Sequence, residues 1–399
     1  MTDPRTGANP RRLVAGNRVF FPAATAYAIF VLPASVLAMT GMTGLFPALA
    51  FVTGHAHEML FGFALAVVAG NQLGPMVLQR LVILFVFWAL ARATFLFAPQ
   101  SIAADAANVA FAALLAAHIA PRLLRAAKKL RNQALPLVLI AICASGIVFQ
   151  LASRGIFAVA QYTILSVAVL LFALLMLFMG GRLIAPAIAG QFYRQGGNLD
   201  ARVQPRIEAG LIVATAIAAA TAAFPGERLL IISSAVATAV AGVLAAVRLV
   251  RWRLWALRGR PDLLCLAAGY GWLAVGLLLF AAALAAGRHQ TAAIHVITVG
   301  SLGTLTLNVM AMSWVLKARQ NPAPLRLPVW GTILIALATL ARVLAGSGVD
   351  DPRTLLLLAS FCWSGAFMLL LVLFVRVRRP SRNGDGHAIH VRKSRDFPN

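Results

Sequence analysis

Residues 55–71 read HAHEMLFGFALAVVAGN. Two histidines and a glutamate open this stretch, and the twelve residues that follow Met59 carry no charge. With its apolar flank it forms a predicted span, residues 56–76, which is long enough to cross a hydrocarbon core as a helix. Ionisable groups are costly to hold at a membrane boundary, so His55, His57 and Glu58 are the first candidates for a functional site.

The same apolar character extends over the whole chain of 399 residues, of which 61% are hydrophobic and only 12% charged. A soluble protein would carry about 25% charged residues. Apolar runs of roughly 17 to 25 residues recur, which is the length of a transmembrane helix. The sequence therefore predicts an all-α fold, a polytopic membrane helix bundle with about twelve transmembrane helices. The predicted spans are approximately 19–40, 56–76, 81–97, 102–120, 134–153, 156–178, 207–224, 229–249, 263–286, 291–316, 327–347 and 354–376.

The basic residues predict how these helices are oriented. The net charge is +24, from 35 Lys and Arg against 11 Asp and Glu. When the loops are assigned alternately to two sides, all but six of the basic residues fall on one side, which the positive-inside rule makes cytoplasmic. The six exceptions are Arg92, Arg154, Arg228, Arg288, Arg342 and Arg353. The basicity therefore reflects membrane topology, and no nucleic-acid partner is expected.

This topology divides the chain into three parts. Residues 1–18 form a cytoplasmic N-terminal segment and residues 19–376 the transmembrane domain. Residues 377–399 form a basic cytoplasmic tail whose polar composition is typical of disorder. The longest predicted cytoplasmic connection, residues 180–206, separates six spans from six.

A third histidine, His295, opens the predicted span 291–316, and the topology places it at the same outer face as His55 and His57. Neutral imidazole ligates copper, iron or zinc, and facing helices can supply the axial ligands of a haem. On a regular helix His55 and His57 lie about 200° apart. They could share a metal only if the segment is irregular, which Gly54 would permit; otherwise each serves a different site. For each histidine, the alternative is an interfacial side chain that binds nothing.

Arg92 lies inside the predicted span 81–97, where a guanidinium needs a partner. Glu58 or Asp105 could supply it, or Arg92 could bind a haem propionate through two parallel hydrogen bonds. Asn308, in span 291–316, is predicted to form an interhelical hydrogen bond.

Four stretches resemble the NnrS family of bacterial membrane proteins. Residues 55–63 (HAHEMLFGF) resemble its signature, and residues 295–300 (HVITVG) resemble the motif of its tenth helix. Residues 88–92 (WALAR) resemble its third helix, and residues 180–184 (GGRLI) resemble a glycine-arginine motif after its sixth. The predicted twelve-helix topology is also similar, so the resemblance covers most of the chain.

The resemblance implies a multi-pass protein of the bacterial inner membrane that holds haem b and copper. It implies a role in nitric oxide metabolism or in tolerance of nitrosative stress, with nitric oxide or an electron donor as partners beside the lipid bilayer. His55, His57 and His295 would be the metal ligands. His57 and His295 are the first choices, with His55 as a third ligand or as the ligand of a second metal, and Arg92 would anchor a propionate or fix Glu58. The resemblance identifies no catalysed reaction.

The chain also departs from the family pattern. Ala267 and Ala268 precede Gly269 where the family's ninth helix often carries a histidine, and no histidine follows Met310 within that span. The alternative function is therefore a twelve-helix transporter of a small solute or metal ion, without haem.

Overall fold

The computed structural model describes residues 13–126, 130–347 and 351–377. Within them, twelve helices are long and apolar enough to cross a membrane. The predictions of an all-α fold and of twelve spans are confirmed, and the protein is a multi-pass membrane protein. Most of segment 1–18 and of tail 377–399 lies outside the described residues, so the assignments of these two parts stay predictions. The side of the membrane on which the chain ends lie also stays a prediction.

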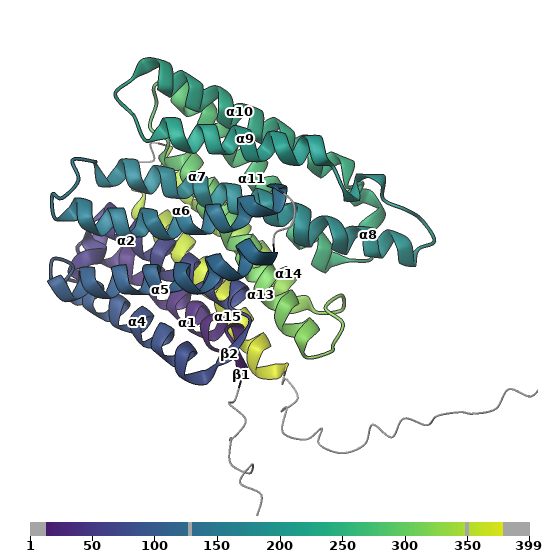
Figure 1. Cartoon of the computed structure of the whole chain (residues 1–399), viewed down its shortest axis with the longest axis horizontal. Helices are drawn as coiled ribbons and strands as arrows, with labels where there is room; N and C mark the ends of the chain where they lie inside the picture. The colour runs from purple at the N-terminus through teal and green to yellow at the C-terminus, as the bar shows by residue number, and fades with distance from the viewer. Residues whose placement is uncertain (1–12, 127–129, 348–350, 378–399) are drawn as a thin grey trace, which may run out of the picture.

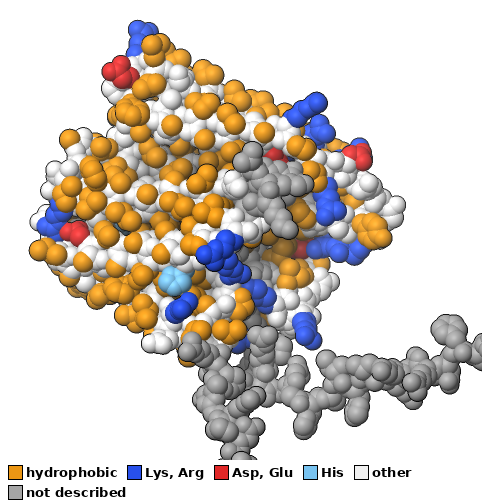
Figure 2. All heavy atoms as spheres, viewed as in Figure 1, with side chains coloured by type: hydrophobic (Ala, Val, Ile, Leu, Met, Phe, Trp, Pro, Cys, Tyr) orange, Lys and Arg blue, Asp and Glu red, His pale blue; other side chains and the backbone are white. Residues whose placement is uncertain are grey.

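The third to eighth spans follow one another across the face that Figure 1 presents. Each contacts the next, from α4 through α10. These helices are α4 (Leu78–Phe97), α5 (Ile102–Ala126), α6 (Leu130–Ser153), α7 (Gln161–Met179), α9 (Pro205–Ala222) and α10 (Arg228–Arg251). Their outward side chains are apolar, and orange covers the middle of the molecule in Figure 2. Such a surface suits lipid rather than water. Examples on α9 and α10 are Val213, Ile217, Val236, Val240, Val243 and Val247.

The first and last spans lie together behind this layer. Helix α1 (Asn17–Met39) packs along α15 (Arg353–Arg376), which in turn packs along α14 (Arg326–Ala345). The indole Nε1 of Trp363 donates to the carbonyl oxygen of Ala28 over 3.1 Å. The hydroxyl of Ser364 donates to the carbonyl oxygen of Ile29 over 2.8 Å. These bonds satisfy polar groups in a region without water and fix the two ends of the chain against each other.

Within the part of the chain that the structure describes, three spans contain a π-helical segment. The second span runs through α2 (Val52–His57), η2 (Glu58–Ala64) and α3 (Leu65–Gln72). The tenth runs through α12 (Thr291–His295), η6 (Val296–Gly303) and α13 (Thr304–Lys317). The sixth continues from α7 through η3 (Gly180–Ile184) into α8 (Ala185–Arg194). π-helical turns are rare and often mark functional sites, because they change which side chains face inward.

The predicted connection 180–206 does separate six spans from six, and much of it is helical, because the sixth span continues to Arg194. Helix α8 is amphipathic: Ile188 and Phe192 are buried, whereas Tyr193 is exposed. Such a helix gains stability from burying one apolar face, although it lacks the long apolar run of a membrane span.

The remaining elements are short. Strands β1 (Leu13–Ala15) and β2 (Pro75–Val77) pair antiparallel, with Leu13 opposite Val77. They connect the start of α1 to the end of the second span. Helix α11 (Pro261–Ala285) packs against α10 and η6.

Candidate cofactor site and buried polar cluster

A cavity of about 470 Å³ lies between the second and tenth spans. Side chains of α1, α7, α14 and α15 complete its wall. Its volume lies within the range of small-molecule and cofactor sites. The wall is mostly apolar, with few polar groups, and three of these are His55, His295 and Arg342.

The two histidines each leave a ring nitrogen for a ligand. A carbonyl oxygen can only accept, so the Nδ1–H of His295 donates to the carbonyl of Thr291 over 2.6 Å. The neutral ring therefore keeps its lone pair on Nε2. Metal-binding histidines commonly have one nitrogen held in this way. Among the described residues, the buried Nδ1 of His55 has no hydrogen-bond partner.

Arg342 is the cationic group of this wall. It forms no ion pair with a carboxylate of the described residues. A guanidinium in an apolar cavity attracts a carboxylate or another anion. Sequence reasoning did not select Arg342 as a site residue, although a single arginine inside the apolar run 327–347 was the available signal.

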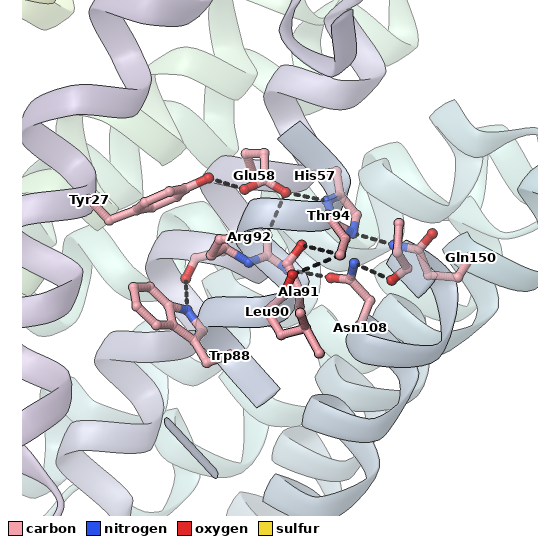
Figure 3. Close-up of polar contacts among 12 residues, drawn as sticks. Tyr27, His57, Glu58, Trp88, Leu90, Ala91, Arg92, Thr94, Asn108 and Gln150 are labelled. Carbon is pink, nitrogen blue, oxygen red and sulfur yellow. Dashed lines mark hydrogen bonds and ion pairs between the residues drawn. The ribbon is translucent and has the colours of Figure 1, made fainter. Parts of the chain in front are cut away.

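His57 lies outside this cavity, in a buried polar cluster (Figure 3). Its Nδ1–H donates to Oε1 of Glu58 over 3.0 Å. Its Nε2 lies 2.9 Å from the amide Nε2 of Gln150, which donates to it. The ring stacks on Phe95, with centroids 4.1 Å apart. Since both ring nitrogens have partners and the side chain is 1% exposed, His57 as a metal ligand stays a prediction that would require these contacts to break.

Glu58 and Arg92 form the centre of the same cluster. The Nη1 of Arg92 donates to Oε1 of Glu58 over 2.5 Å, and both side chains are buried. The hydroxyl of Tyr27 donates to Oε2 of Glu58, and the Nη2 of Arg92 donates to Oδ1 of Asn108. A buried ion pair needs such additional bonds to offset the loss of hydration.

Of the partners predicted for Arg92, the structure thus selects Glu58. Asp105 pairs instead with Arg154, whose Nε lies 2.5 Å from Oδ2. Arg92 does not line the cavity, so its predicted contact with a propionate is replaced in this structure by the contact with Glu58. The predicted interhelical bond of Asn308 is confirmed, because its Nδ2 donates to the hydroxyl of Thr332 on α14 over 2.8 Å.

Two details explain how η2 holds this cluster. The indole Nε1 of Trp88 donates to the carbonyl of Gly62 over 2.9 Å, which gives a π-segment carbonyl an additional partner. A Cβ on Gly62 would lie 2.8 Å from Nη1 of Arg92 and 3.0 Å from Oε2 of Glu58. Only glycine at this position lets the backbone approach the ion pair so closely.

His55 and His57 therefore face different surroundings. The segment α2 that carries them is a regular α-helix, so they project from different faces. Gly54 does not unwind it. A Cβ there would lie 1.9 Å from the carbonyl oxygen of Ala48, so Gly54 serves close packing instead. The structure thus brings together only two of the three predicted metal ligands. His55 and His295 line one cavity, whereas His57 lies in the cluster with Glu58.

The donor set of the cavity agrees better with haem than with a metal held by protein alone. Among the described residues, no group of three or more His, Cys, Asp or Glu could hold a metal ion. A haem iron needs only one or two protein ligands, because the macrocycle supplies the others. Met39 and Met59 also line the cavity, and thioethers together with imidazole suit Cu(I).

Comparison with known proteins agrees with this architecture. The model of the family described as NnrS protein matches residues 13–380. A search of curated proteins finds no match. The match covers almost the whole chain, including both histidine-bearing spans, and the chain therefore belongs to the NnrS family.

Proposed function

We propose that this protein binds haem b in the cavity between its second and tenth spans and acts on, or senses, nitric oxide in the bacterial inner membrane. One observation carries the proposal: His55 and His295, 240 positions apart in the sequence, line the same cavity. Membership of the NnrS family supports the same reading.

His295, His55 and Arg342 each have a place in this proposal. His295 would bind through Nε2, since its Nδ1–H is used by Thr291. His55 has a buried nitrogen without a partner and would bind the second metal, copper. Arg342 would bind a propionate. When bound, haem iron provides a site for diatomic ligands, whose behaviour depends on pocket polarity and steric access.

Copper is the second part of the proposal. Met39 and Met59 line the same cavity as the two histidines. Cu(I) would bind to these thioethers with the imidazole of His55, which leaves His295 for haem. The buried cluster of Glu58, Arg92 and His57 would then position η2, and through it His55, without touching the cofactor.

The first experiment is an optical spectrum of the detergent-purified protein, oxidised and reduced, with iron and copper analysis of the same sample. A Soret band with near-stoichiometric iron is expected. His295→Ala should lose most of the iron and His55→Ala most of the copper, while the protein still inserts. His118→Ala is a matched control, because its Nδ1 is held by the carbonyl of Leu114 over 2.7 Å in the same way, outside the cavity.

Two results would overturn this assignment. Unchanged iron content in His295→Ala would place the haem elsewhere. Protein without chromophore or metal, expressed with ample haem and copper, would reject cofactor binding and leave the transporter alternative to be tested by solute uptake.

A further inference from the structure

A narrow cavity of about 80 Å³ continues the cofactor cavity toward the end of the bundle where the second span finishes. The cofactor cavity is lined by Phe63 of the second span, Val169 of the sixth and Leu302 of the tenth. The narrow cavity is lined by Ala64, by Phe172 and again by Leu302. Each of the three spans thus passes from one cavity to the next within one helical turn. We call the narrow cavity, which these three spans enclose, the apolar passage.

The lining of the apolar passage suits an uncharged molecule. None of the described residues that line it is charged. The polar ones are Asn71 and Gln72, at the end of the second span, and Thr306, whose hydroxyl donates to the carbonyl of Leu302 over 2.7 Å. Apolar cavities stay dry, and an ion without partners is costly to bury. The passage therefore favours apolar molecules over water and ions.

The volume of the passage limits the size of such a molecule. A cavity needs about 10–15 Å³ to hold one water molecule, so about 80 Å³ leaves room for a molecule of two or three heavy atoms. Sites for cofactors and larger ligands have volumes of about 300–1,000 Å³. The passage is thus too small for haem or for a typical organic solute.

The passage opens at the edge of the hydrocarbon core. Leu183, which lines it, has a 38% exposed side chain. Leu183 lies about 33 Å along the sixth span from Gln161, at 1.5 Å per residue, and the hydrocarbon core is about 30 Å thick. Met179 and Val309, which also line the passage, are half-buried. Since these side chains are apolar, the mouth gives access from the bilayer.

Two π-helical segments end where the two cavities meet. Segment η2 ends at Ala64 and segment η6 ends at Gly303. A π turn changes which side chains face inward. Beyond these turns, Val67 of α3 and Val309 of α13 line the passage. The passage and the cofactor cavity are therefore formed by the same two irregular spans, packed against the sixth.

We infer that the apolar passage carries a small uncharged gas molecule from the hydrocarbon core to the cofactor cavity. The inference rests on the proposed function, in which this molecule is nitric oxide. An apolar gas leaves water readily for hydrocarbon, so a mouth that faces lipid receives it directly. Side chains in packed interiors change rotamer, which lets a small molecule pass a residue such as Leu302. His55 and His295 lie at the end of this route.

Carbon monoxide is the kinetic probe. Its rebinding to the ferrous haem after flash photolysis measures access to the cofactor cavity. Val68→Phe places a ring in the passage, so the packing must yield before the gas can pass, and rebinding should be about tenfold slower. Val138→Phe is the control, because Val138, on α6, is similarly buried and lines neither cavity. The control should change the rate less than about twofold.

Xenon tests the passage without haem. Apolar cavities bind xenon, and xenon NMR of the haem-free protein should show binding that Val68→Phe weakens and Val138→Phe retains. Ala64→Val, a smaller change where the cavities meet, replaces Val68→Phe if the larger ring prevents insertion. A wild-type protein that takes up no haem would reject the proposed function, and the xenon measurement would still test the passage.

Two results would overturn the inference. One is equal xenon binding in the passage variants and the control. The other is carbon monoxide rebinding as fast in the passage variants as in the control, at equal iron content, because the gas would then reach the cofactor cavity by another route.

Discussion

The buried ion pair between Glu58 and Arg92 provides the sharpest test of the packing described above. Glu58→Gln keeps the shape of the side chain but removes its charge, which leaves Arg92 buried at 4% exposure without a counterion. Arg92→Met leaves the carboxylate of Glu58, which is 0% exposed, without the guanidinium that balances its charge. Breaking one partner of such a pair costs about 3–5 kcal/mol.

Removing both charges should cost much less than the two single changes together. Glu58→Gln/Arg92→Met leaves no unpaired charge, and its main loss is the bond that Arg92 donates to Asn108. An unpaired buried acceptor of this kind costs about 1–3 kcal/mol. The two single costs add to about 6–10 kcal/mol, so the coupling free energy should be at least about 3 kcal/mol, at the upper end of values for residues in contact.

The free energy of unfolding can be measured for the three variants by SDS titration in mixed micelles, with helix content followed by circular dichroism. The exposed pair Asp105–Arg154 is the matched control, because Arg154 has a 35% exposed side chain. Asp105→Asn and Arg154→Met should couple by only about 0–1 kcal/mol. If the Glu58 and Arg92 changes add to within about 0.5 kcal/mol, the cluster does not stabilise the bundle as an ion pair.

Three further outcomes are expected. Trp88→Phe removes the indole bond to the carbonyl of Gly62 and should lower the free energy of unfolding by about 0.5–1.5 kcal/mol in the same SDS titration, the cost of one neutral hydrogen bond; an unchanged midpoint would mean that this bond does not stabilise η2. Gly181→Ala places a Cβ 2.2 Å from Nη2 of Arg248 and should lower the free energy of unfolding by about 1–3 kcal/mol. An unchanged midpoint would mean that η3 can move away from the ion pair of Arg248 with Glu208. Arg342→Gln should weaken haem retention about tenfold while iron ligation persists, seen as faster haem transfer to apomyoglobin with an unchanged Soret position, because only a propionate contact is lost.

The sequence alone determined the twelve spans. A membrane helix is specified locally, by about 20 consecutive apolar residues, and each such run is visible without knowledge of any other. The need of Arg92 for a partner was equally local, because a guanidinium inside an apolar helix must be compensated wherever the bundle places it. The sequence also determined that His55 and His57 face different sides of a regular α-helix, because they are two residues apart.

Only the tertiary structure decided which of these residues meet. The helical period places His55 and His57 on different faces, but which face meets the tenth span depends on how the second span is rotated against its neighbours. The π segments η2 and η6 begin directly after His57 and His295 and change the rotation of each span from within. The contact of η6 with α14 then brings Arg342 to the same cavity. No run of apolar residues encodes such contacts, because they depend on packing between helices far apart in the sequence.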